Sequence, residues 1–199
     1  MEPVIRVAIV DDHPAVRIGL NAALQAEPDI EPVGSATGAG DLEPLLYRTR
    51  PDVVLLDYHL PGTDGLSICR RIKSQALAPA VLLYSAFADD SLAVPAIVAG
   101  ADGVLHKSAP PRELYERLRA VARGDGALPP VSASALRAAG DALDPEDLPV
   151  LGMLVERTPP SDIADALHIG RSELNRRMAR MLARIKAPVP APARPAPPA

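Results

Sequence analysis

The stretch at residues 53–65 constrains the fold most, because it places a carboxylate directly after a buried strand. Its first four residues are apolar, and two of them are β-branched, which predicts a strand buried on both faces. The run ends at Asp57, and the turn signals Leu60-Pro61-Gly62 and Asp64-Gly65 follow. An acid in this position lies at the carboxyl edge of a sheet, where open α/β sheets bind their ligands. Taken alone, Asp57 is more simply explained as the cap of a turn.

The stretch belongs to a repeating strand–helix pattern that fills residues 4–123. Strand-like apolar runs occur at 4–10, 30–36, 53–57, 80–85 and 103–106, and residues with helical spacing follow each run. This alternation predicts an α/β fold, a doubly wound five-stranded parallel sheet with helices on both faces. Pro32 interrupts the second run, so we expect that strand near an edge. Asp12 is a candidate cap for the first helix, residues 89–91 are candidate caps for the fourth, and Pro95 falls inside the fourth.

Polar groups end four of the five predicted strands, and the fold brings these strand ends to one edge. They are Asp11 with Asp12, Asp57, Ser85 and Lys107. Carboxylates held together repel each other, and Mg²⁺ is the usual cation that relieves such repulsion between oxygen ligands. A metal ion, an ammonium and a hydroxyl together suit the oxygens of a transferring phosphoryl group. Asp57, at the end of the third run, is the candidate nucleophile.

These motifs resemble the receiver domain of two-component response regulators, which has a flavodoxin-like fold. The resemblance covers residues 4–123 and rests on Val-Asp-Asp-His at 10–13, Leu-Leu-Asp at 55–57, Leu-Pro-Gly-Thr-Asp-Gly at 60–65, Ser85, and Gly-Ala-Asp-Gly-Val-Leu-His-Lys at 100–107. It implies that Asp57 accepts a phosphoryl group from a sensor histidine kinase, and that Ser85 and Lys107 read the phosphorylated state. It also implies a Mg²⁺ site formed by Asp11, Asp12, Asp57 and the main-chain carbonyl of His59.

One position departs from the receiver pattern. Val104 stands where receivers usually have an aromatic switch residue, so a degenerate receiver that works without phosphate is a rival interpretation. A haloacid-dehalogenase phosphatase would also use an aspartyl nucleophile, but it needs a second Asp where this chain has His59, and we therefore expect a regulator and not an enzyme. Cys69 is expected in the core. The histidines lack metal-ligand spacing, and we expect their side chains at the surface or in turns: His13, His59, His106 and His168.

The second part of the chain has the spacing of three short helices. Residues 124–142 are rich in Gly, Ala, Pro and Ser and predict a linker, with a helical turn near Ala133–Ala139. Helices are expected at 148–155, at 161–167 with Ser161 as its cap, and at 171–185 after a tight turn. Two helices around a glycine turn are typical of a helix-turn-helix, and an ordinary helical hairpin explains the spacing equally well. The outward arginines of the last helix are Arg171, Arg176, Arg177, Arg180 and Arg184.

This part also resembles the LuxR-type helix-turn-helix of NarL-like regulators. The matching motifs are Leu-Asp-Pro-Glu at 143–146, Ile-Ala-Asp-Ala-Leu at 163–167 and Ile-Gly-Arg-Ser-Glu-Leu-Asn-Arg-Arg-Met at 169–178. The resemblance implies DNA contacts by Arg171, Asn175, Arg176, Arg177 and Arg180. Glu173 replaces the usual Thr and would repel phosphates, and the family's fourth helix is missing from the sequence. Residues 143–199 carry 8 basic and 7 acidic side chains, which is a weak electrostatic footprint for DNA.

The interpretation that unites these features is a cytoplasmic response regulator. Its expected parts are a receiver domain at 1–123, a linker at 124–142, a small all-α helix-turn-helix domain at 143–186 and a Pro-rich disordered tail at 187–199. The expected partners are a sensor histidine kinase and DNA, and a homodimer would fit. The single Cys excludes an internal disulfide, and no apolar run approaches the roughly 18 residues of a membrane helix. The open alternative is a regulator whose terminal domain contacts proteins instead of DNA, with or without phosphorylation.

Overall fold

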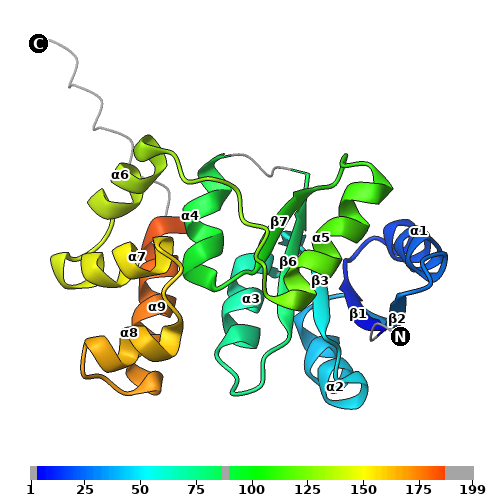
Figure 1. Ribbon diagram of the computed structural model, residues 1–199, viewed down its shortest axis with the longest axis horizontal. Helices are drawn as coiled ribbons and strands as arrows, with labels where there is room; N and C mark the ends of the chain where they lie inside the picture. The colour runs from blue at the N-terminus through cyan, green and yellow to red at the C-terminus, as the bar shows by residue number, and fades with distance from the viewer. Residues whose placement is uncertain (1–3, 87–89, 187–199) are drawn as a thin grey trace, which may run out of the picture.

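Five parallel strands form the centre of the molecule (Figure 1). The structure is a computed structural model that describes residues 4–86 and 90–186. The strand order is β2-β1-β3-β6-β7, and every pairing is parallel. This arrangement confirms the doubly wound sheet that the strand–helix alternation predicts. The strands are β1 (Ile5–Val10), β2 (Ile30–Ala36), β3 (Val53–Asp57), β6 (Ala80–Ser85) and β7 (Gly103–His106), and a short hairpin adds β4 (His59–Leu60) and β5 (Thr63–Asp64).

Alternate strand residues point to opposite faces of the sheet, and each face carries its own core. Val7 and Ile9 of β1 join one core, whereas Ala8 and Val10 join the other. Leucines from α1 (Pro14–Gln25) and α5 (Pro111–Arg123) cover the first face. The second face is covered by α2 (Ala39–Thr49), α3 (Gly65–Lys73) and α4 (Asp90–Ala99). Both faces of β3 are therefore buried, as its apolar sequence predicts.

The prolines lie where the sequence predicts them, but the helix cap predicted at Asp12 is not formed. Pro32 lies in edge strand β2, opposite a register shift between Val7 and Ala8, as expected. Pro95 lies inside α4, and part of the cap expected at residues 89–91 falls outside the described residues. The expected cap by Asp12 is wrong: His13 is the N-cap residue of α1, and the Asp12 carboxylate lies 2.8 Å from the His13 ring nitrogen Nδ1.

The C-terminal helices lie beside α4 at one end of the molecule (Figure 1). They are α6 (Ala133–Asp141), the 3₁₀ turn η1 (Pro145–Asp147), α7 (Leu148–Val155), α8 (Pro160–Ala166) and α9 (Arg171–Lys186). The predicted helical turn near Ala133 is a nine-residue helix, capped by Ser132, whose side chain accepts a hydrogen bond from the Ala135 amide at 3.2 Å. The predicted tail at 187–199 falls outside the described residues. In the described part of the chain, every helix is too short or too polar to pass through a lipid bilayer.

The expected cap of α8 by Ser161 is also wrong. Pro159 is the N-cap residue, and its carbonyl accepts hydrogen bonds from the amides of Asp162 and Ile163, each at 3.0 Å. The Ser161 hydroxyl donates instead to the Asp162 carboxylate at 2.9 Å. Pro160 occupies the first helical position, where its missing amide costs little. The helix therefore begins one residue earlier than the sequence indicates.

Helix α4 is buried on all sides and joins the two parts of the chain. Its apolar residues surround the helix, and seven of them are buried: Leu92, Ala93, Val94, Ala96, Ile97, Val98 and Ala99. A helix that is apolar all round needs partners on every face. The sheet side supplies some of these partners, and α6, α7 and α9 supply the others. One continuous core thus runs from the sheet through α4 to Met178 and Met181 of α9.

Candidate functional site

The carboxyl edge of the sheet gathers the predicted chemical groups. Asp57 ends β3 and is 3% exposed, while Asp11, directly after β1, is 2% exposed. Ser85 ends β6 and is fully buried. The Nζ atom of Lys107 donates hydrogen bonds to Asp11 Oδ2 at 2.7 Å and to Asp57 Oδ2 at 2.8 Å. The strand ends therefore converge on one polar cluster, called the pocket below, as the order of elements predicts.

Lys107 and Asp11 hold each other in the charged form. Burial acts to lower the pKa of Lys107, but its hydrogen bonds to Asp11 and Asp57 outweigh this effect and hold the pKa above its usual value. Burial acts to raise the pKa of Asp11, but the hydrogen bonds from Lys107 and the His13 amide outweigh it, so the pKa lies below its usual value. The ammonium and the Asp11 carboxylate are both charged at neutral pH.

A cluster of acids whose composition suits a cation lies at the same edge of the sheet. One possible ligand atom from each of Asp11, Asp12, His13 and Asp57 lies within 4.8 Å of the others. The three carboxylates are hard oxygen donors, which fit Mg²⁺. His13 is exposed, as expected, yet its ring nitrogen Nδ1 lies beside the acids, which the sequence spacing did not predict. The amide of His59 donates to Asp57 Oδ1 at 3.2 Å, and its carbonyl as a metal ligand stays a prediction.

Two further residues shape this site in ways that the sequence analysis did not predict, although Gly65 was recognised as part of a turn. The Tyr84 hydroxyl donates to the Lys107 carbonyl at 3.2 Å, and the Lys107 ammonium lies 5.7 Å from the centre of the Tyr84 ring. Gly65 lies so close to the Asp57 carbonyl oxygen that a Cβ atom would collide with it, and the same Cβ would come within 2.8 Å of the Tyr58 Cα. An aromatic residue next to Ser85 and a glycine at the start of a helix were the available signals.

The residues predicted to contact DNA separate into two groups on α9. Arg171 and Asn175 touch the receiver part: Arg171 donates to the Gln75 carbonyl, and Asn175 Oδ1 accepts from Arg70 Nη2 at 3.0 Å. The second group makes ion pairs within α9 and consists of Arg176, Arg177 and Arg180, all with Glu173. The outward arginine Arg184 pairs with Asp144.

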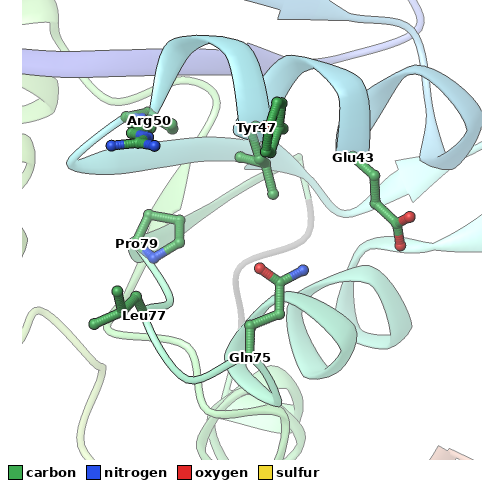
Figure 2. A pocket seen from close by; sticks show the side chains of 8 residues that line it. Glu43, Tyr47, Arg50, Gln75, Leu77 and Pro79 are labelled. Atoms are coloured by element: carbon green, nitrogen blue, oxygen red, sulfur yellow. The ribbon is translucent and has the colours of Figure 1, made fainter.

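A groove of about 660 Å³ lies near the opposite edge of the sheet, between α2 and the loop before β6. Figure 2 shows its labelled lining: Glu43, Tyr47, Arg50, Gln75, Leu77 and Pro79. Tyr47 is 83% exposed and Leu77 is 94% exposed. Pro51 and Pro79 precede the amino ends of β3 and β6, so this groove has no part in the chemistry at Asp57.

Comparison with known proteins agrees with this geometry. A family model described as the response regulator receiver domain matches residues 7–119. The chain belongs to this family. The named relatives that match most of the chain are transcriptional regulators and not enzymes, so the expectations of a receiver fold and of a regulator are both confirmed.

Relatives extend the similarity beyond the receiver. The transcriptional regulatory protein LiaR of Bacillus subtilis is 33% identical over 83% of this chain and 83% of its own length. The DNA-binding transcriptional activator DevR/DosR of Mycobacterium tuberculosis is 30% identical over 91% of this chain and 88% of its own. A crystal structure of a LuxR-family two-component response regulator from Aurantimonas sp. SI85-9A1 is 34% identical, with a TM-score of 0.60, over 64% of this chain and 91% of that one.

Proposed function

We propose that this chain is a response regulator in which Asp57 accepts a phosphoryl group from a sensor histidine kinase and the C-terminal helices regulate transcription by binding DNA. The observation that carries the proposal is the position of Asp57. Its carboxylate is buried at the end of the central strand, 2.8 Å from the Lys107 ammonium and next to Asp11. A carboxylate placed among a cation and further acids is poised to act as a nucleophile toward phosphorus.

The residues of the pocket divide the chemistry among them. An oxygen of Asp57 forms a bond to phosphorus as the phosphorus–nitrogen bond of the kinase phosphohistidine breaks, and the electron pair of that bond stays on the histidine nitrogen. Mg²⁺, held by Asp11, Asp12, Asp57 and the His59 carbonyl, would supply positive charge beside the phosphoryl oxygens. Lys107 exchanges its hydrogen bond to Asp57 for one to a phosphoryl oxygen, and Ser85 offers a hydroxyl to another.

DNA is the proposed target of the second part. Helices α8 and α9 are joined by a short turn in which His168 has a positive φ of 54°, a layout typical of a helix-turn-helix. Arg171, Asn175, Arg176, Arg177 and Arg180 are the proposed contacts. Such domains usually read two half-sites as dimers, so we propose a homodimer on DNA. Because a histidine kinase is the proposed phosphoryl donor and DNA the proposed target, we propose that the protein acts in the cytoplasm.

Protein contact in place of DNA binding is the weaker candidate. The similarity to LiaR and DevR/DosR covers the C-terminal helices as well as the receiver, and both names are those of transcriptional regulators. Val104 alone does not favour a receiver that works without phosphate. The residues that phosphorylation would use are all present at the end of the sheet: Asp11, Asp57, Ser85 and Lys107. We therefore favour phosphorylation and DNA binding together.

One experiment tests both halves of the proposal on the same sample. The full-length protein is incubated with acetyl phosphate and Mg²⁺, its intact mass is measured, and its binding to promoter DNA is followed through a salt titration. We expect the intact mass to increase by one phosphoryl group. We also expect the logarithm of the affinity for DNA to fall linearly with the logarithm of the salt concentration. No mass gain contradicts the phosphoacceptor, and no salt-sensitive, sequence-selective binding in either state contradicts the DNA output.

A further inference from the structure

Three arginines on α9 converge on one carboxylate. Glu173 Oε2 accepts hydrogen bonds from Arg176 Nη2 at 2.7 Å and from Arg176 Nε at 3.1 Å. Its second oxygen, Oε1, accepts from Arg177 Nε at 3.4 Å and lies 3.8 Å from Arg180 Nη2. We call Arg176, Arg177 and Arg180 the arginine clamp. Each member of the clamp makes an ion pair with this single acid.

The clamp lies away from the receiver part of the chain. Leu174, Met178, Met181 and Leu182 are the buried stripe of α9 and pack into the shared core. Asn175 is hydrogen-bonded to Arg70, on the receiver side of the helix. Arg176 and Arg180 are instead 67% and 50% exposed. Arg177 is 22% exposed, so Arg176 and Arg180 are the members of the clamp that a large partner reaches first.

Guanidinium groups gathered around one oxyanion make a phosphate-binding arrangement. Arg forms charge-assisted hydrogen bonds to phosphate with the same planar fork that it uses for carboxylates. The hydrogen bonds from Arg176 hold the pKa of Glu173 below its usual value, so the acid stays ionised at neutral pH. Glu173 thus occupies, with a full negative charge, the place that a phosphate oxygen would take. Its position in the first turn of α9 is also favourable for a carboxylate, because the helix dipole is positive there.

We propose that Glu173 competes with the phosphodiester backbone of DNA for binding to the arginine clamp. A backbone phosphate binds the clamp by displacing the Glu173 side chain, and the carboxylate lowers affinity without removing the site. Because ion pairs near the surface add little net stability, replacing Glu173 by a phosphate on the clamp costs the fold little. The inference rests on the proposed DNA-binding function and adds the residue that limits its strength. It also assigns Glu173 a defined contact, where the sequence indicated only general repulsion of phosphates.

The test compares the full-length wild type with Glu173→Gln in a salt titration against one double-stranded DNA fragment. We expect Glu173→Gln to bind about fivefold more tightly at low salt, as removal of one unit charge about 4 Å away across water predicts. Its logarithmic salt slope should steepen by about 0.9, the value for one charge, because the guanidinium charge that Glu173 neutralises in the wild type becomes available to DNA phosphates. Glu156→Gln makes the same change of net charge at an exposed position outside the clamp, and it should match the wild type. Thermal melting confirms that each variant is folded.

Further variants separate the possible outcomes. Adding Arg176→Ala to Glu173→Gln should remove most of the gain, because Arg176 makes the shortest contacts of the clamp. Equal affinity and slope for wild type and Glu173→Gln overturn the clamp and leave the proposed function standing. An equal gain for Glu156→Gln also overturns it, because the effect then reports net charge alone. If no protein binds DNA in either phosphorylation state, both the clamp and the DNA-binding function are wrong.

Discussion

Arg70 of α3 donates a hydrogen bond to the Asn175 side chain of α9, 105 residues later in the chain, at 3.0 Å. The same guanidinium reaches the Met178 sulfur at 3.3 Å, and Arg70 is only 7% exposed. Within the described residues, no carboxylate pairs with it, and its Nε has no hydrogen-bond partner. Burial lowers its pKa. The contact between α9 and the receiver thus contains a buried cation without an anion, which is costly.

Replacing this cation with an apolar side chain should favour the docked arrangement. Arg70→Met keeps a flexible, unbranched side chain, two atoms shorter, and removes the buried charge, and replacements of buried charges by apolar side chains are often neutral or stabilising. We expect the free energy of unfolding to rise by roughly 1 kcal/mol, a Tm increase of about 2–4 °C for a chain of this size. DNA affinity should fall, because Asn175 and Arg171 stay against the receiver for more of the time. Calorimetry and DNA titration measure the two effects.

The neighbouring Arg71 supplies the control for this prediction. It lies on the same helix but is exposed, and its ion pair with Glu43 spans 3.6 Å at the surface. Arg71→Met should change the Tm little, since exposed ion pairs contribute little. A loss of stability in Arg70→Met as large as that of a buried-core deletion would mean that the guanidinium stabilises the contact.

The sequence predicted the parts of this molecule that depend on neighbouring residues. Alternating strand and helix patterns predicted the order of elements, and the parallel topology then brought Asp11, Asp57, Ser85 and Lys107 to one edge. The docking of α9 on α3 and α4 was not predicted. It depends on contacts between residues about a hundred positions apart, which leave no local periodicity. The one local signal was α4, whose sequence is apolar on every face and therefore needs a second partner besides the sheet.

Competition between alternative roles explains the wrong cap at Asp12. An Asp before a helix is a good cap, but Asp12 is also one of the clustered acids, and its side chain lies with His13 in that cluster. Both roles satisfy the same local pattern, so only the folded arrangement of residues distant in sequence decides between them. The proximity of the His13 ring to these acids was likewise not predicted, because spacing along the chain carries no information about Asp57.

Removing the Asp57 carboxylate should abolish phosphorylation. Asp57→Asn keeps the shape of the side chain but lacks the anionic oxygen that attacks phosphorus. Intact mass after incubation with acetyl phosphate and Mg²⁺ should show one added phosphoryl group in the wild type and none in the variant. Asp141→Asn, which changes an exposed acid outside the pocket, should be labelled like the wild type. Labelling of Asp57→Asn, or labelling without a divalent metal, would point to another acceptor.

Lys107 should stabilise the fold by neutralising two buried acids. Lys107→Met leaves Asp11 and Asp57 facing each other without their ammonium, and breaking a buried ion pair in this way costs about 3 kcal/mol of unfolding free energy. Mg²⁺ should restore part of this loss, because the remaining carboxylates are its proposed ligands. Denaturant unfolding with and without Mg²⁺ measures both effects. Lys73→Met removes the ion pair with Asp102 at 2.9 Å, and its loss should not respond to Mg²⁺. The same Mg²⁺ response in both variants would argue against a cation site beside Lys107.

Gly65 should be required for the close approach of its backbone to the main chain of Asp57 and Tyr58. Because a Cβ at this position collides with the Asp57 carbonyl and the Tyr58 backbone, both of which are main chain, Gly65→Ala forces the loop apart. We expect a loss of about 1–3 kcal/mol in unfolding free energy, together with slower labelling by acetyl phosphate, since His59 no longer holds the Asp57 carboxylate in place. Gly19→Ala is the matched control. That glycine lies in α1 with open space around it, and the substitution should stabilise the chain by roughly 0.5–1 kcal/mol without changing the labelling rate. Normal stability and normal labelling in Gly65→Ala would show that the loop tolerates a side chain and that its tight packing has no role in positioning Asp57.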